Sequence, residues 1–273
     1  MGRLSLVGGG AVGVLVALSA LAATAGTWKL LGISWVAFLA MGLGIPLGQR
    51  TWGGRSWALV WGYGLAAGAM VTSAAVFLLP QAIAHHATFG GFGVALGLLI
   101  GFAGHTIGHR LAHYDLPLDR TVAALSAHSL SAGIIIGVVY GNMPELGPLL
   151  GLAIVSHKGP AGYAAARRLS ASDRDPTLLL LPAAGVGITA LSASLIQLPA
   201  APVVRGIVFG FAAGIFLHVA MDFLPRCEIG SDVHDLLTVT GDAHELLDRL
   251  RIHAVLSTGL GGTVVFLAWL LVS

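Results

Sequence analysis

Charged side chains are scarce in this chain of 273 residues. Asp, Glu, Lys and Arg together make up 10% of it, while the apolar residues make up 56%. Soluble globular proteins carry about 25% charged residues, so the composition argues against a soluble enzyme, a nucleic-acid-binding protein and a disordered chain. The mean hydropathy of +0.88 points the same way. The composition predicts an all-α polytopic membrane helical bundle with the lipid bilayer as a partner and no nucleic acid.

Cysteine is the next scarce residue type. A single cysteine, Cys227, excludes an intramolecular disulfide framework and a metal cluster built on cysteine. Glycine is abundant by contrast, with 39 residues. Because glycine lets helices approach one another closely in a bilayer, this abundance suits the predicted bundle.

Nine apolar runs approach or exceed the roughly 20 residues that a membrane span needs. They cover residues 4–24, 31–48, 57–83, 91–111, 121–141, 146–166, 176–197, 203–225 and 252–272 of a single transmembrane domain, 1–273. The first run has features of a signal peptide, but its apolar stretch exceeds the usual signal core of about 7–15 residues, so we favour a span. The longest polar segment, 226–251, is predicted to be a solvated cytoplasmic loop, with a short helix from Asp242 onward as the alternative for its last part.

Positive charges predict the orientation of these spans. Under the nine-span interpretation, eleven of the fourteen Lys and Arg residues fall on one side of the membrane: Arg3, Arg50, Arg55, Arg110, Arg120, Arg167, Arg168, Arg174, Arg226, Arg249 and Arg251. The other side receives only Lys29 and Arg205, and Lys158 lies within a span. The positive-inside rule then places the N-terminus and the 226–251 loop in the cytoplasm and the C-terminus outside. We expect the membrane to be the plasma membrane, the inner membrane of a bacterium.

Few ionisable side chains remain inside the predicted spans, and such groups are functional candidates because a bilayer disfavours them. They are His105, His109, His128, His157, Lys158, His218 and Asp222. His105, His109 and His113 recur every four residues and share one helix face, which predicts a polar pathway toward the loop that holds His113. His218 and Asp222 share a face in the same way. For each histidine the alternative is an ordinary hydrogen bond to a facing carbonyl.

The sixth run contains a proline beside two ionisable residues. Pro160 offers no N–H to the carbonyl of Ser156, and its ring crowds that carbonyl, so a kink is predicted next to His157 and Lys158. Broken helices often form ion sites in transporters. The alternative is the ordinary proline kink of a membrane helix.

Four segments share a pattern of histidine, proline and small residues. They are residues 77–82 (FLLPQA), 128–133 (HSLSAG), 157–162 (HKGPAG) and 214–225 (GIFLHVAMDFLP). In this order they resemble the motifs "HLLPEA", "HSxxEG", "HKxPEG" and "GTFLYVALVDLLPE" of the ZIP (Zrt- and Irt-like) family of divalent-metal transporters. The resemblance covers residues 31–272 and implies eight core spans, with residues 1–24 as one extra N-terminal span. It also implies a metal ion as cargo and no permanently bound cofactor.

A fifth segment competes for the alignment. Residues 141–145 (GNMPE) resemble another motif of that family, "HNxPEG", but they fall at the outer end of the fifth span. The 29 residues from His128 to His157 equal one span plus a turn, so these two histidines are predicted to lie at similar depth on antiparallel helices. We therefore align the motif on His128.

The resemblance implies a metal site in which each histidine is followed, one turn later, by a glutamate. Here those two positions are Ala132 and Ala161, and Lys158 occupies the neighbouring position for a second metal. The predicted metal ligands are His128 and His157, with Ser129 and Ser131 as weak oxygen ligands and with Asp222 and His218 as the residues that compensate for the missing carboxylates. Lys158 and Pro160 complete the predicted pathway.

Three hypotheses follow. The first is a divergent ZIP-type transporter of divalent transition metals, with zinc as the leading candidate because imidazole ligands suit zinc. The second is a ZIP-fold protein that has lost metal transport and acts as a sensor, a partner subunit or a carrier of another solute. The third, a membrane-embedded enzyme, is disfavoured because the chain has no HExxH, no GxSxG and no carboxylate pair within a span. A homodimer stays an open alternative to a monomer.

Overall fold

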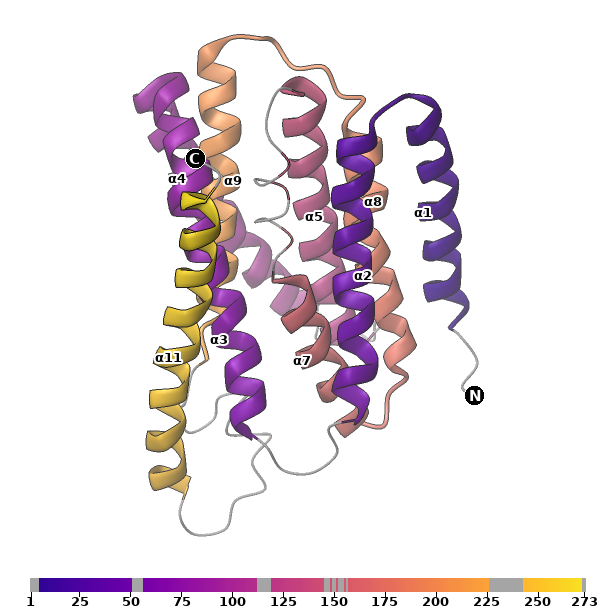
Figure 1. Ribbon diagram of the computed structural model, residues 1–273, viewed down its shortest axis with the longest axis vertical. Helices are drawn as coiled ribbons and strands as arrows, with labels where there is room; N and C mark the ends of the chain where they lie inside the picture. The colour runs from indigo at the N-terminus through magenta and orange to yellow at the C-terminus, as the bar shows by residue number, and fades with distance from the viewer. Residues whose placement is uncertain are drawn as a thin grey trace.

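The computed structural model describes residues 5–50, 56–111, 119–144, 148, 151, 155, 157–225 and 243–271, and within them every regular element is helical. In chain order these are α1 (Leu6–Thr24), α2 (Trp28–Arg50), α3 (Ser56–Ser73), the π-helical turn η1 (Ala74–Leu78), α4 (Leu79–Leu111), α5 (Arg120–Asn142), α7 (Lys158–Ala171), the 3-10 turn η2 (Pro176–Leu179), α8 (Leu180–Ala193), α9 (Pro202–Phe223) and α11 (Ala243–Leu270). The all-α prediction is confirmed (Figure 1).

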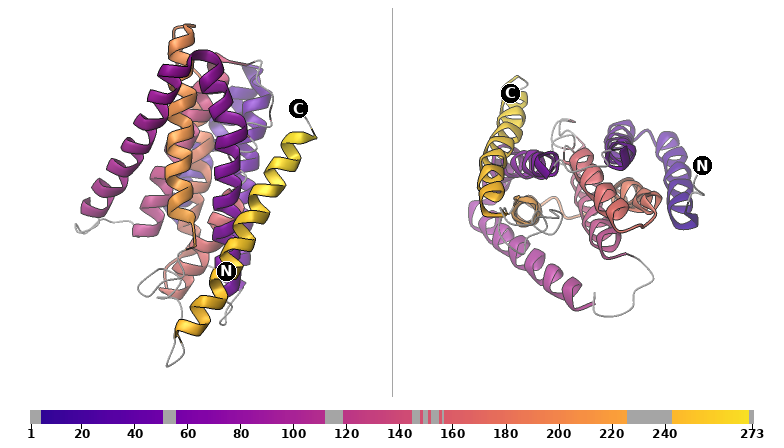
Figure 2. Two further views of the ribbon diagram at one scale, coloured as in Figure 1. Left: turned by 90° about the vertical axis from the view of Figure 1, so that its left-hand side faces the viewer. Right: turned by 90° about the horizontal axis from the view of Figure 1, so that it is seen from below.

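The helices have the length and composition of membrane spans. Among the described residues, seven continuous helical segments are long and apolar enough to cross a bilayer. One of them, residues 60–104, bends at His86, whose backbone is extended (φ −167°, ψ 104°). The two limbs then run in opposite directions (Figure 2), as expected for two spans. Large apolar side chains such as Leu99, Val255 and Leu267 are exposed on the outer faces, where they suit contact with lipid. The chain is thus an integral membrane protein of the helical class.

The helices pack in two groups. In the first, α2 packs on α7 and α8, α5 packs on α8, and α1 lies on the outside of α8. In the second, α4 packs on α9 and α11 packs on α3. Helix α3 joins the groups because it contacts both α7 and α9. The peripheral place of α1 suits an additional span at the edge of a core bundle (Figure 1).

Hydrogen bonds between distant segments show which helix ends lie together. The backbone N–H of Ser5, before α1, donates to the hydroxyl of Thr177 in η2 (3.1 Å). At the other end of the bundle, the Lys29 ammonium donates to the carbonyl of Pro144 (2.7 Å). The described ends of the chain also lie at opposite ends of the bundle (Figures 1 and 2). The described helix ends therefore lie on two sides of the bundle, while the number of spans and their direction across the membrane stay predictions.

One predicted boundary shifts. Helix α11 begins at Ala243, so the last part of the expected 226–251 loop, residues 243–251, is helical and continuous with the last span. The reason is an amphipathic pattern: Leu247 and Leu250 are buried together with Val60 of α3, while Asp248 and Arg251 pair on the exposed face (2.6 Å). This agrees with the alternative of a helix from Asp242 onward, and the helix continues into the last span. Residues 226–242 lie outside the described residues.

Candidate functional site

Two histidines meet between α5 and α7. His128 lies in α5 and His157 immediately precedes α7, and their Nε2 atoms are 3.1 Å apart. At this distance one ring donates a hydrogen bond and the other, in its neutral form, accepts it. His157 is buried. The proximity agrees with the equal depth predicted from their spacing in the sequence.

The start of α7 explains how His157 reaches this position. Helix α7 begins at Lys158, and its first hydrogen bond runs from the Ala161 N–H to the His157 carbonyl (3.0 Å). Pro160 is the third helical residue, where a missing N–H costs nothing because the first turn has no carbonyl partners. The break predicted at Pro160 thus takes the form of a helix start inside the bundle. The positive end of the helix dipole lies there.

A lysine and a serine lie beside the pair. The Lys158 ammonium donates a hydrogen bond to the hydroxyl of Ser129 (3.2 Å), and both side chains are buried. The Ser131 hydroxyl donates to the carbonyl of His128 within α5 (2.9 Å). Both serines predicted as weak metal ligands therefore already have hydrogen-bond partners. The Ser129 hydroxyl oxygen accepts a hydrogen bond from the lysine and orients it, so this oxygen is not directed only at the histidines.

Aromatic rings of α9 cover the histidine pair. The ring centroid of His157 lies 5.9 Å from that of Phe216 and 6.2 Å from that of Phe223. The ring of His128 lies 6.5 Å from that of Phe223. Because Phe216 and Phe223 are seven residues apart, they project from the same face of α9. The pair is consequently shielded on this side by hydrocarbon.

His218 lies about 140–160° around α9 from the two phenylalanines, and Asp222 lies about 100–120° from them. His218 Nε2 is 3.6 Å from Asp222 Oδ2, and the His218 ring packs over Gly101 of α4. The structure therefore brings His128 together with His157 and places His218 beside α4, so a site that joins all four residues stays a prediction. Among the described residues, no group of three or more His, Cys, Asp and Glu side chains is arranged to hold a metal ion.

The predicted histidine pathway is described only in part. Helix α4 carries the backbone of His105 and His109, but their side chains lie outside the described part of the structure, and His113 lies outside the described residues. The pathway toward the loop after α4 therefore stays a prediction.

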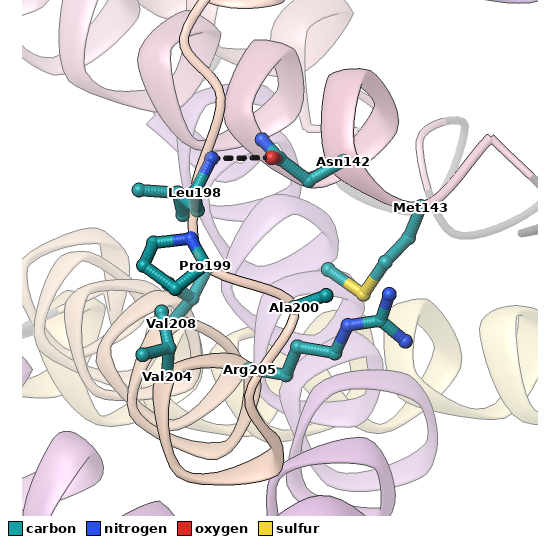
Figure 3. A pocket seen from close by; sticks show the side chains of 8 residues that line it. All are labelled: Asn142, Met143, Leu198, Pro199, Ala200, Val204, Arg205 and Val208. Atoms are coloured by element: carbon teal, nitrogen blue, oxygen red, sulfur yellow. Dashed lines mark hydrogen bonds between the residues drawn. The ribbon is translucent and has the colours of Figure 1, made fainter.

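The competing segment at residues 141–145 has a structural role. The Asn142 amide donates to the carbonyl of Ile196 (2.8 Å), and its Oδ1 accepts from the N–H of Leu198 (2.7 Å). Asn142 thereby holds the α8–α9 connection beside a small pocket that Met143 and Arg205 also line (Figure 3). These hydrogen bonds give Asn142 a structural role that needs no metal ion, which is in line with aligning the motif on His128.

Sequence reasoning missed the aromatic wall. The seven-residue spacing of Phe216 and Phe223 predicts a shared face, but both faces of α9 are apolar over most of their length. The sequence therefore offers no hint of which face turns toward α5 and α7.

No protein-family model matches this chain, and no curated protein matches it. The four motif segments are thus the whole basis of the ZIP resemblance.

Proposed function

We propose that the protein transports divalent transition-metal ions, with zinc as the leading candidate, and that His128 and His157 form its transport site. One observation carries the proposal: the two Nε2 atoms converge at 3.1 Å. Two nitrogen ligands on a tetrahedral zinc ion lie about 3.3 Å apart, because each Zn–N bond is about 2.05 Å long. A metal ion can therefore bind both nitrogens at nearly their present separation, once each ring turns so that its Nε2 lone pair points at the ion instead of at the other ring.

Two protein ligands suit a transported ion. A site with two imidazoles leaves coordination positions for water, and binding stays weak enough for release. For a neutral pair, metal binding moves the hydrogen that the rings share to the Nδ1 atom of the donating ring, because both Nε2 lone pairs must face the ion. The break before α7 supports this role, because transporter ion sites often lie where a helix is interrupted. The ordered motif segments of the ZIP resemblance support the same function.

A second candidate function is a ZIP-fold carrier of an anion. The observation that favours it is the position of Lys158, which is buried beside the pair and bonded to Ser129. The start of α7 adds partial positive charge, and helix N-termini readily bind anions. Two neutral imidazoles beside an ammonium group disfavour a dication, since charges interact strongly in a medium of low dielectric constant.

Uptake into proteoliposomes tests the metal proposal. The double substitution His128→Ala and His157→Ala is expected to reduce zinc uptake at least about tenfold, since it removes both ligands. The matched control is His253→Ala, which removes an imidazole of α11 that bonds the indole N–H of Trp61 (3.1 Å). Equal uptake by the wild type, the double variant and the control would exclude the pair as the transport site.

One substitution separates the two candidates. Lys158→Met keeps much of the side-chain length and removes the charge. For a metal transporter the variant should bind zinc more tightly, because the repulsion is gone. For an anion carrier the same variant should lose uptake of tracer chloride, sulfate or phosphate. Parallel uptake of zinc and of these anions by one preparation gives the answer, with size-exclusion chromatography as the check on folding.

A further inference from the structure

A groove runs along the seam between α2, α3 and α7, and we call it the α2–α3–α7 groove. It is lined by residues from the ranges 40–47, 57–65 and 159–163. It encloses about 380 Å³, which falls within the roughly 300–1,000 Å³ that is usual for the site of a small ligand. Figure 1 shows α7 between the other two helices. The groove is therefore large enough to hold a ligand along the side of the bundle.

The register of the helices gives the groove a direction. A Cβ added at Gly44 would meet Gly159 and Tyr163, and one added at Gly48 would meet Tyr163 and Arg167. Helices α2 and α7 therefore run in the same direction along the groove. The end of α2 and the start of α3 lie at the same end of the bundle (Figure 1), so α3 runs in the opposite direction. One end of the groove thus lies near the end of α2, and the other lies at the start of α7.

The lining of the groove suits hydrocarbon. The lining side chains carry no charge, and the indole N–H of Trp61 already donates to Nδ1 of His253 (3.1 Å). On the rim, Leu43 is 65% exposed, Leu47 is 57% exposed and Trp57 is 45% exposed, so the groove is continuous with the apolar surface that contacts lipid. A polar solute or a bare polypeptide backbone would find few hydrogen-bond partners here, and burying its polar groups would cost free energy. An acyl chain has no such groups.

Two arginines lie at the end of the groove that holds Trp57. Arg50 follows Leu47 by three residues in α2, and Arg167 follows Tyr163 by four residues in α7. Each arginine is therefore about one turn beyond the lining, on the same helix face. Tryptophan is enriched at the membrane–water interface, where the lipid headgroups lie, and arginine is well suited to binding phosphate. The positive charge therefore lies where the phosphate of a lipid would lie if its acyl chain entered the groove.

We propose that the α2–α3–α7 groove binds an anionic phospholipid, with one acyl chain between the three helices and the phosphate at the level of Arg50 and Arg167. The inner part of the chain then lies against Gly159 and Pro160 in the first turn of α7. That turn directly follows His157, so the lipid contacts the helix start that positions one member of the histidine pair. Lipid binding stands by itself, and only an effect of the lipid on transport would rest on the proposed function.

Native mass spectrometry of the full chain in a mild detergent tests the headgroup. The protein is titrated with phosphatidylglycerol and, in parallel, with phosphatidylcholine that has the same acyl chains. We expect one phosphatidylglycerol to be retained in preference to phosphatidylcholine, and Arg50→Gln to lower this preference about fivefold, the contribution of one basic residue to binding an anionic lipid. Arg205→Gln is the matched control because Arg205 lies beside Asn142 at the other end of the bundle. Equal retention of the two lipids, or an unchanged preference in Arg50→Gln, would overturn the proposal.

A substitution inside the groove tests the acyl chain. A Cβ at Gly62 would lie 3.5 Å from Cδ1 of Tyr163, which is an ordinary contact, so Gly62→Leu can be accommodated and its longer side chain fills the groove. Because several methylene groups lose their contacts, the variant should retain phosphatidylglycerol at least about tenfold less tightly. Gly42→Leu is the matched control, since a Cβ at Gly42 meets no atom within 4 Å. Equal retention by the two variants would overturn the proposal.

Photo-cross-linking tests the position of the lipid without any substitution. Phosphatidylglycerol with a diazirine on its acyl chain should label peptides that contain residues 40–47, 57–65 or 159–163, and labelling confined to other peptides would overturn the proposal. A dimer that Gly62→Leu dissociates would show that a second copy of the chain occupies the groove instead. These results are independent of uptake: a protein that retains the lipid in the groove but takes up no zinc would support the lipid site and reject the proposed function.

Discussion

The two polar regions of this bundle use the same imidazole chemistry in opposite electrostatic settings. Between α5 and α7, the histidine pair lies beside the buried Lys158 and under two phenylalanine rings. Where α4 packs on α9, His218 lies beside Asp222, whose side chain is 37% exposed. A nearby ammonium weakens the binding of a dication, and a carboxylate strengthens it. The neighbours of a histidine are therefore expected to set the charge of any ion that binds beside it.

The regions also differ in how they are built. The pair is positioned by side chains: the Ser129 hydroxyl holds Lys158, and rings of α9 cover the imidazoles. The contact of α4 with α9, which carries His218, depends on backbone contact at glycines such as Gly97 and Gly214. A change to one of these glycines should therefore disturb the α4–α9 contact first, while a change to a polar side chain should disturb the histidine pair first.

The largest expected effect comes from Gly97→Ala. The added methyl group would overlap the carbonyl of Phe211, so α4 and α9 must separate, at a cost of about 3 kcal/mol in the free energy of unfolding. Thermal unfolding followed by tryptophan fluorescence measures the loss. Gly91→Ala is the matched control, because its added methyl meets no atom within 4 Å. Equal stability of both variants would show that the glycine contacts do not hold the helices together.

Ser129→Ala should have the next largest effect. It removes the hydroxyl that accepts a hydrogen bond from the buried Lys158 ammonium, and losing a hydrogen bond to a charged group costs about 2 kcal/mol. Ser126→Ala makes the same chemical change one turn earlier in α5, where the buried hydroxyl has no hydrogen-bond partner among the described residues, and should cost nothing. Denaturant unfolding compares the two. An equal loss of stability in both variants would show that the hydrogen bond between Lys158 and Ser129 does not stabilise the fold beside the histidine pair.

The helical membrane class and the meeting of the two histidines could be predicted, because each depends on length, while the count of nine spans stays a prediction. Apolar runs of about 20 residues fix where helices cross, and the interval from His128 to His157 fixes their shared depth. The rotation of α9 could not be predicted. This helix is packed on both sides, with Phe216 and Phe223 toward the pair and His218 toward α4, so hydrophobic periodicity does not say which face meets which neighbour.

The start of α11 shows a second limit. Segment 226–251 is rich in charge, which favours a loop and leaves a helix from Asp242 onward only as an alternative, and in the structure residues 243–251 belong to the last helix. Leu247 and Leu250 are buried against Val60, and that burial depends on a partner 187 positions earlier in the chain than Leu247. Contacts between residues far apart in sequence decide such cases, and composition within one segment does not reveal them.

The smallest expected effect comes from adding a carboxylate beside the histidine pair, which lacks the neighbour that His218 has in Asp222. Ala132→Glu and Ala161→Glu each place a carboxylate one turn after a histidine, on the same helix face. Both alanines are buried. If the pair binds metal, either variant should raise its zinc affinity at least about tenfold, or about 1.4 kcal/mol, because the added charge opposes that of Lys158. Zinc titration in an Asp222→Asn background confines the readout to the pair.

Ala132→Gln and Ala161→Gln are the matched controls, since glutamine has the size of glutamate without its charge. The expected result is that the glutamine variants bind zinc as the unsubstituted protein does, while the glutamate variants bind it more tightly. The carboxylate itself then accounts for the gain in affinity, and the two regions differ mainly in the charge beside each histidine. Equal affinity of the glutamate and glutamine variants would mean that the motif register on His128 and His157 is wrong. In that case the anion carrier becomes the better account of the pair, because Lys158 would then be the group that selects the solute rather than one that a metal must tolerate.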